Sequence, residues 1–166
     1  VITPSQHLKD FIINLGFKNK IKRINNGVNI PKENGKIFTN DQINITIVSR
    51  LVTHKNIEKI IGAISDLNNP LIKLNIIGDG PELKQLQSIA LRSDQKENII
   101  FHGKLHRDDI NNIFLNSDIY IQASNYEGLP HSLLEAMSYG IPILCTPVGE
   151  CKELLGNEDR GYKLDR

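Results

Sequence analysis

The chain has 166 residues, of which 39% are hydrophobic and 23% charged, a composition typical of one globular, soluble domain. Its net charge is +1 with acids and bases interspersed, so neither nucleic acid nor bulk membrane is favoured as a partner. Tryptophan is absent and aromatic residues are scarce, which argues against a surface that stacks on single-stranded bases. No segment has the length and apolarity of a signal peptide or a transmembrane segment.

Two cysteines, Cys145 and Cys151, lack the spacing of metal ligands. Cys145 follows an apolar run and is expected to be a buried, reduced thiol, which suits a cytoplasmic protein. Peripheral attachment at the inner membrane face is left open. The chain starts at Val1 without a methionine, and we expect it to be a piece of a longer protein.

In chain order, apolar residues at helical spacing predict a first helix over residues 8–15. Residues 21–24 then run into Asn25-Asn26-Gly27, a sequence that predicts a turn. The polar, irregular segment 31–41 is expected to be a surface loop.

Short apolar runs alternate with helical patterns over the rest of the chain. The predicted strands cover residues 43–48, 71–77, 99–101, 119–121 and 141–145. The predicted helices cover residues 57–67, 83–90, 110–114, 133–137 with an end at Gly140, and 150–155. This alternation predicts an α/β fold, a Rossmann-like parallel sheet with helices on both faces, in which ligands bind at the carboxyl ends of the strands.

Basic residues follow the strand 43–48. Arg50 offers a fork of donors and Lys55 a compact charge, and fixed cations of this kind can neutralise a diphosphate leaving group without a metal. Taken alone, the two could equally be solvated loop residues. Their place at the carboxyl end of a strand favours phosphate binding.

A glycine-rich turn, Gly78-Asp-Gly-Pro81, follows the strand 71–77. A dinucleotide fingerprint needs a third glycine where this chain has Leu83, so a dehydrogenase is disfavoured. A tight turn that lets a ligand approach the backbone at Gly78 is the better interpretation. His102, after the next strand, is given no catalytic role.

The most informative segment carries Glu127 and Glu135, with Pro130 at the start of a helix between them. Free N–H groups at a helix start can hold phosphate or sugar oxygens, and two carboxylates can accept bonds from hydroxyl groups. The pattern suggests a sugar nucleotide as ligand. The alternative is an exposed loop acid and a solvated helix acid. No metal-binding cluster and no P-loop motif is present in the sequence.

Taken together, these motifs resemble the carboxyl-terminal half of retaining GT-B glycosyltransferases, the "glycosyl transferases group 1" (family four) type. The resemblance rests, in order, on segments 48–55, 77–81, 101–103, 127–142 and 148–149. It implies that residues 1–166 form a single donor-binding domain of a longer two-domain enzyme, whose amino-terminal acceptor domain is absent.

The resemblance also implies roles for individual residues. Arg50 and Lys55 would bind the diphosphate, and Glu127 would hold hydroxyls of the donor sugar; these three are the candidate catalytic residues. The remaining candidates would bind the donor. Gly78 would allow its close approach, the backbone at Leu105 would contact the base, and Gly128, Leu129 and Pro130 would border the sugar. The backbone of His131, Ser132 and Leu133 would face phosphate, and Glu135 would bind the ribose diol. No metal and no cofactor is expected beside the nucleotide-diphosphate sugar.

Two positions depart from the family pattern. Asn56 follows Lys55 where glycine is frequent, and Gly149-Glu150 stands where Gly-Gly is frequent. Neither change removes a charged candidate, but the shape of the last loop is in doubt.

The resulting hypothesis is a hexosyltransferase domain that serves retaining sugar transfer to a glycan or lipid-linked acceptor, in surface polysaccharide or lipopolysaccharide biosynthesis. The acceptor would be bound through the amino-terminal domain, so the isolated fragment is expected to be inactive. Two alternatives remain: a non-catalytic nucleotide-binding or interaction domain of the same fold, and a sugar-nucleotide epimerase.

Overall fold

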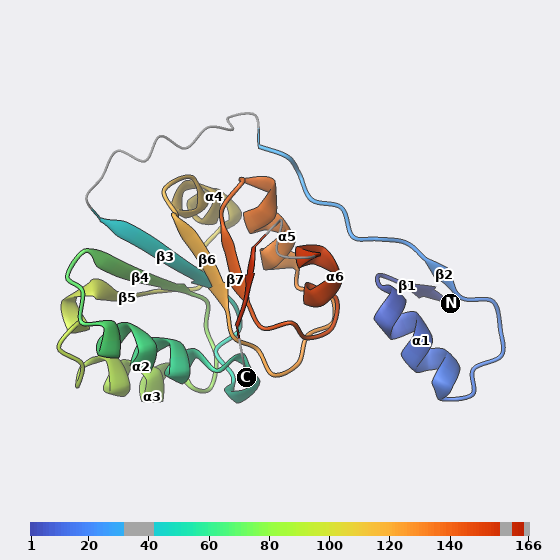
Figure 1. Ribbon diagram of the computed structural model, residues 1–166, viewed down its shortest axis with the longest axis horizontal. Coiled ribbons are helices and arrows are strands. Elements are labelled where there is room, and N and C mark those ends of the chain that lie inside the picture. Colours follow the sequence, from blue (N-terminus) through green and yellow to red (C-terminus); the bar gives the residue numbers. More distant parts are fainter. Residues whose placement is uncertain (32–41, 157–160, 165–166) are drawn as a thin grey trace.

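The computed structural model describes residues 1–31, 42–156 and 161–164. Six parallel strands form one sheet in the order β5-β4-β3-β6-β7-β8 (Figure 1). The strands are β3 (Ile43–Val48), β4 (Ile72–Ile77), β5 (Ile99–Gly103), β6 (Ile119–Gln122), β7 (Ile143–Cys145) and β8 (Tyr162–Lys163). The predicted fold class is therefore confirmed. Apart from Pro31, the predicted loop 31–41 lies outside the described residues.

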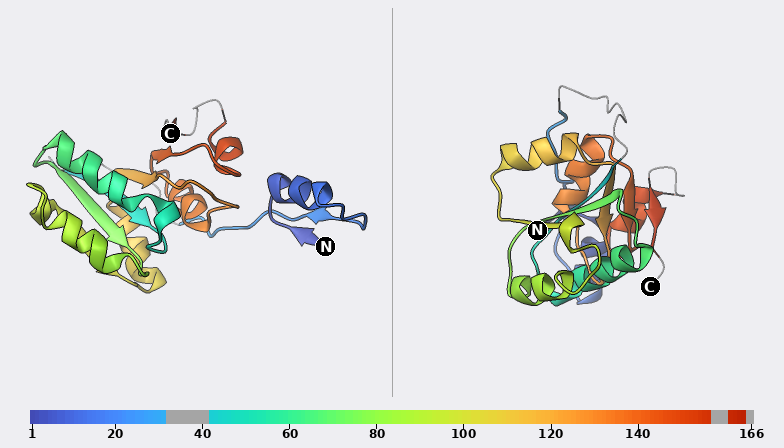
Figure 2. Two further views of the ribbon diagram at one scale, coloured as in Figure 1. Left: turned by 90° about the horizontal axis from the view of Figure 1, so that it is seen from below. Right: turned by 90° about the vertical axis from the view of Figure 1, so that its left-hand side faces the viewer.

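Helices lie on both faces of the sheet, as the alternation predicted. Helices α2 and α3 cover one face, and α4 and α5 cover the other (Figures 1 and 2). The bounds are α2 (Ile57–Leu67), α3 (Leu83–Ala90), α4 (Arg107–Leu115), α5 (His131–Ser138) and α6 (Cys151–Leu155), with short 3-10 turns η1 (Thr53–Lys55) and η2 (Lys96–Asn98). No helix within the described ranges is long and apolar enough to cross a membrane.

The apolar core is divided by the sheet into two clusters. Ile57, Ile60, Ile61 and Ile64 of α2 are at most 4% exposed and pack on the inner strands β3 and β4. The second cluster joins α4, α5 and α6 to β6 and β7. Each fully buried isoleucine contributes roughly 1.5–3 kcal/mol through removal of its side chain from water. This burial holds the carboxyl ends of β3, β4 and β6 in fixed positions.

Strand β7 begins at Ile143, two residues later than predicted. Pro142 has no N–H to give to the ladder, although its carbonyl oxygen accepts the N–H of Tyr120 at 2.9 Å. Ile141 instead donates its N–H to Ala136 at the end of α5. Gly140 directly follows the last residues of that helix, as predicted.

The first residues form a small unit of their own, consisting of β1 (Ile2–Thr3), α1 (Gln6–Asn14) and β2 (Lys22–Arg23). The two strands pair in parallel outside the main sheet, and the unit lies beside α6 (Figure 1). Ser5 caps α1 by accepting the N–H of Leu8 at 3.1 Å. The turn predicted at Asn25-Asn26-Gly27 is wrong: residues 24–31 carry no turn, and Asn25 accepts a hydrogen bond from the Arg23 guanidinium instead.

Candidate functional site

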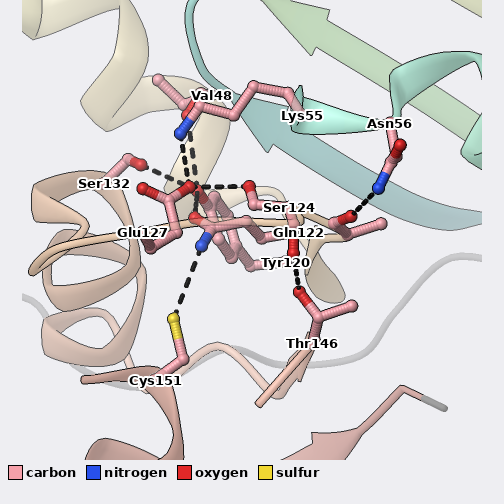
Figure 3. A network of polar contacts seen from close by, with 11 residues as sticks. Val48, Lys55, Asn56, Tyr120, Gln122, Ser124, Glu127, Ser132, Thr146 and Cys151 are labelled. Carbon is pink, nitrogen blue, oxygen red and sulfur yellow. Dashed lines mark hydrogen bonds and ion pairs between the residues drawn. The ribbon is translucent and has the colours of Figure 1, made fainter. Parts of the chain in front are cut away.

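Lys55 and Glu127 form an ion pair at the carboxyl edge of the sheet. Lys55 ends the 3-10 turn that follows β3, and Glu127 lies in the loop that follows β6, the neighbouring strand. The Nζ of Lys55 contacts Oε1 of Glu127 (Figure 3). The sheet thus brings together two predicted residues that are 72 positions apart.

Glu127 is buried, with 8% of its surface exposed, and a second donor holds it in place. The hydroxyl of Ser124 donates to the same oxygen, Oε1, at 2.6 Å, and the Ser124 carbonyl accepts from Thr146 at 2.6 Å. Both donors use Oε1, so within the described part of the chain Oε2 has no hydrogen-bond partner. A fixed carboxylate with one open oxygen can accept a bond from a ligand hydroxyl.

Asn56 explains one departure from the family pattern. Its backbone is left-handed, with φ of 51°, a conformation that asparagine tolerates and glycine adopts freely. The Asn56 amide also donates to the Ala123 carbonyl and to Asn125 Oδ1, both at 2.7 Å. Asparagine therefore satisfies the same backbone requirement and in addition ties Lys55 to the loop that carries Glu127.

A hollow of about 510 Å³ opens where β3, β4 and β5 end. It brings together three predicted residues, Arg50, Gly78 and Leu105. Its lining consists of Val48, Ser49, Arg50, Ile77, Gly78, Asp79, Gly80, Lys104, Leu105 and Ile110. The Ser49 hydroxyl is buried without a hydrogen-bond partner. A buried hydroxyl of this kind is stabilised by a polar ligand group that reaches it.

At Gly78 the structure shows a close approach of protein backbone, and the predicted approach of a ligand stays a prediction. The φ of Gly78 is +132°, and a Cβ at this position would lie 1.8 Å from the Ser49 carbonyl oxygen. Only glycine lets the chain after β4 pass this close to the chain after β3. Gly78 therefore shapes the wall of the hollow.

Glu135 lies on α5 and pairs with two basic side chains. Arg107, at the start of α4, approaches Glu135 Oε1 at 3.3 Å, and His131 Nδ1 approaches the same oxygen at 3.4 Å. As for Glu127, both partners use one oxygen and leave the other open. Arg107 lies two residues after Leu105, which lines the hollow.

Helix α5 starts directly after Pro130, one residue later than a proline in the first turn would place it. Pro130 is the residue before the first turn of α5, with φ of −71°, and the first turn begins at His131. The Tyr120 hydroxyl donates to Ser132 Oγ at 2.8 Å and anchors this turn to β6. Burial raises the pKa of Tyr120, so the phenol stays protonated and keeps donating. Gly128 and Leu129 lie between Glu127 and this helix start.

The predicted residues thus lie in three groups, all on segments that follow the carboxyl ends of strands. Arg50, Gly78 and Leu105 line the hollow, Lys55 pairs with Glu127, and Glu135 pairs with Arg107 and His131. Arg50 is exposed and forms no ion pair with another described residue. Its guanidinium is available to an anionic ligand.

Several polar residues of the site were not predicted. They are Ser49, Asn56, Lys104, Arg107, Ser124 and Thr146. Ser124 had a weak signal, since it stands three residues before Glu127 at the end of a strand. Arg107 and Thr146 meet their partners only through tertiary packing, for which a single sequence has no local signal.

His102 and the two cysteines contact other residues of the protein in ways that suit a structural role. The His102 ring lies 2.9 Å from Asn75 Oδ1, and burial together with the charge of Lys73 lowers the pKa of its imidazole. Cys145 and Cys151 are both buried and unbridged, which confirms the prediction of a buried thiol. Among the described residues, no group of three or more His, Cys, Asp or Glu side chains could hold a metal ion.

Comparison with known proteins places this site in a family. The profile of the family described as "Glycosyl transferases group 1" matches residues 29–166. The O-antigen biosynthesis glycosyltransferase WbnH of Escherichia coli is 35% identical over 95% of this chain and 47% of its own length. Protein CapJ of Staphylococcus aureus is 33% identical over 84% of this chain and 35% of its own length. The chain therefore spans half or less of the length of these relatives.

The fold has a close counterpart among solved structures. Anabaena HepE, solved in complex with UDP-glucose, superimposes with a TM-score of 0.84 at 22% identity. The superposition covers 98% of this chain and 49% of HepE. At this level of identity the likeness establishes the shared fold.

Proposed function

The chain belongs to the glycosyl transferases group 1 family, and from this premise we propose that it binds the nucleotide-diphosphate sugar donor of a glycosyltransferase. The observation that carries the proposal is the partly buried Lys55–Glu127 pair, a fixed cation and a fixed carboxylate on segments that follow β3 and β6, while Arg50 lines the hollow where β3, β4 and β5 end. A donor of this kind has an anionic diphosphate next to a sugar rich in hydroxyls. The two charges match these two parts.

Each group of residues has one part of the donor to hold. Arg50 and Lys55 neutralise the diphosphate as the bond between the anomeric carbon and its oxygen breaks. Oε2 of Glu127 accepts a hydroxyl of the sugar, and Oε2 of Glu135 accepts the ribose diol. The backbone of Gly128, Leu129 and Pro130 borders the sugar. The N–H groups from His131 to Leu133 face a phosphate at the start of α5.

The reaction exchanges one bond at the anomeric carbon for another. The bond to the diphosphate breaks, a bond to the acceptor oxygen forms, and the acceptor hydroxyl loses its proton. We propose that the transferred sugar is a hexose, that its configuration is retained, and that the acceptor is a glycan or a lipid-linked saccharide. The acceptor would be held by a preceding domain. Support for a surface-polysaccharide product comes from the E. coli relative, which is an O-antigen biosynthesis glycosyltransferase.

Calorimetric titration of the complete protein with UDP, GDP and ADP tests the donor site. UDP is the first choice, because HepE was solved with UDP-glucose. We expect one of the three nucleotides to bind. Arg50→Ala and Lys55→Ala should each weaken its binding by about 1.5–3 kcal/mol, the value of a hydrogen bond to a charged group.

Matched controls separate diphosphate binding from a general loss of positive charge. Arg92→Ala and Lys96→Ala remove the same side chains from exposed positions after α3, at the opposite end of the sheet. These two variants should bind the nucleotide like the wild type. Equal weakening in all four variants, or no binding of any nucleotide by the wild type, would contradict the proposed donor site.

A further inference from the structure

Glu150 is a buried carboxylate that the proposed donor site does not use. Only 3% of its surface is exposed, and Glu127 is the other buried acidic residue among those that the structure describes. It stands where the family frequently has a second glycine. A buried charge is costly unless the fold gives it partners, so its contacts indicate its role.

All but one of the partners of the Glu150 side chain come from the first 31 residues. The N–H of His7, in the first turn of α1, donates to Glu150 Oε1 at 2.8 Å, across 143 positions of sequence. Arg23 of β2 places Nη2 at 3.9 Å from Glu150 Oε2 and at 3.2 Å from Glu153 Oε1. The carboxylate therefore joins the helix and the second strand of the β1–α1–β2 unit to the start of α6.

These contacts outweigh the cost of burying the charged Glu150 carboxylate. Burial alone would raise the pKa of Glu150, but its interactions with the His7 N–H, with the side chains of Glu153 and Ser5 and with the charge of Arg23 bring this pKa below its usual value. Glu150 is thus held as a charged group between the two parts of the chain.

The backbone at the same position contacts the donor loop, residues 127–130. The N–H of Glu150 donates to the Gly128 carbonyl at 3.2 Å. Directly before it, Gly149 has φ of +54°, and a Cβ there would lie 2.0 Å from the Glu127 carbonyl oxygen. Residues 149–150 therefore lie against the loop that holds the sugar-binding carboxylate.

We infer that Glu150 is a positioning residue, which couples the β1–α1–β2 unit through its side chain to the donor loop through its backbone. When the unit is released, the donor loop loses its support and binds the nucleotide sugar less well. A glycine at this position keeps the backbone contact and loses the coupling. The inference rests on the proposed function only for its effect on donor binding.

Hydrogen exchange of the complete enzyme, read by mass spectrometry without ligand, tests the coupling. In Glu150→Gly we expect at least about tenfold faster exchange in residues 5–10, because the His7 N–H loses its charged acceptor. The inference requires that exchange also quickens in residues 124–130. Glu150→Gln can still accept from His7 but has lost the charge that attracts Arg23, so its effect should be smaller in both segments.

A folding check, a control variant and the Kd for UDP complete the test of the coupling. Exchange in β4 should stay unchanged, which shows that the variants are folded. If Glu150→Gly does not fold, the exchange of Glu150→Gln in residues 5–10 and 124–130 tests the coupling in its place. Glu97→Gln, an exposed acid on η2, should behave like the wild type. In Glu150→Gly the Kd for UDP should rise about tenfold.

Faster exchange confined to residues 5–10, with residues 124–130 unchanged and the Kd within twofold, would overturn the inference. Failure of wild-type protein to bind UDP would instead count against UDP as the donor nucleotide, and the exchange data would still decide the role of Glu150.

Discussion

Glu127 and Glu135 share one arrangement of their carboxylates, although they lie in different elements. In each, two side chains of the protein hold Oε1, and Oε2 is open. The two side chains that contact Oε1 fix the orientation of the carboxylate, and in our proposal the open Oε2 faces a ligand hydroxyl. Orientation by packed and hydrogen-bonded neighbouring side chains is the usual way in which a binding carboxylate is preorganised.

The Lys55–Glu127 pair should be important for stability as well as for binding. Lys55→Met removes the cation and leaves the buried Glu127 unpaired, so we expect a loss of about 3 kcal/mol in the free energy of unfolding, measured by urea denaturation. The double variant Lys55→Met/Glu127→Gln should recover much of this loss, because the unpaired charge is gone. Equal stability of the single and double variants would show that the pair is not electrostatically coupled.

Glu150 gives a prediction for the pH dependence of stability. Its pKa is lower in the folded chain than in the unfolded one, so its contribution is present above the unfolded value, near 4.5, and is lost as the pH falls through the folded value. Urea denaturation between about pH 3 and pH 7 should show a shallower acid decline for Glu150→Gln than for the wild type. Parallel declines would contradict the assigned contacts.

At the scale of elements, the sequence was informative wherever one face of an element is buried. The isoleucines of α2 and the apolar runs of β3 and β4 recur at the periods of a helix and a strand, so these bounds were predicted to within a residue. The strands β1, β2 and β8 have two residues each, too few to show a period, and none was predicted as such. The late start of β7 depends on Pro142, which has no N–H to give to the ladder although it lies in an apolar run.

The candidate site was predictable in part for the same reason. Arg50, Lys55 and Glu127 lie in the connections that follow strands β3 and β6, and parallel strands bring their carboxyl ends to one edge. The partners that orient them, such as Ser124 and Arg107, depend on how α4 and the loops pack. The proposed roles of all these residues remain predictions.

The loop between β7 and α6 gives a prediction about stability. Gly149→Ala should cost several kcal/mol of unfolding free energy, because a Cβ would collide with the Glu127 and Gly128 carbonyl oxygens at 2.0 and 2.9 Å. Gly140→Ala is the matched control, since Gly140 also has positive φ but nothing within 4 Å, and should cost only about 1–2 kcal/mol. Similar losses in both variants, measured by thermal unfolding, would show that the contact with the donor loop is unimportant.

At the scale of the molecule, the chain covers half or less of its curated relatives, and its activity should depend on the remainder. We expect residues 1–166, expressed alone and shown to be folded by circular dichroism, to bind the donor nucleotide weakly and to transfer no sugar. The complete enzyme should transfer sugar with retained configuration, as read from the anomeric proton coupling of the product. Transfer by residues 1–166 alone would contradict the assignment of acceptor binding to a preceding domain.

The most direct measurement is a crystal structure of the complete enzyme with its nucleotide sugar. The proposed donor site predicts the diphosphate within hydrogen-bond distance of Arg50 and Lys55, a sugar hydroxyl on Oε2 of Glu127, and the ribose on Oε2 of Glu135. A nucleotide sugar bound away from this edge of the sheet, or bound there without contact to any of these four side chains, would contradict it.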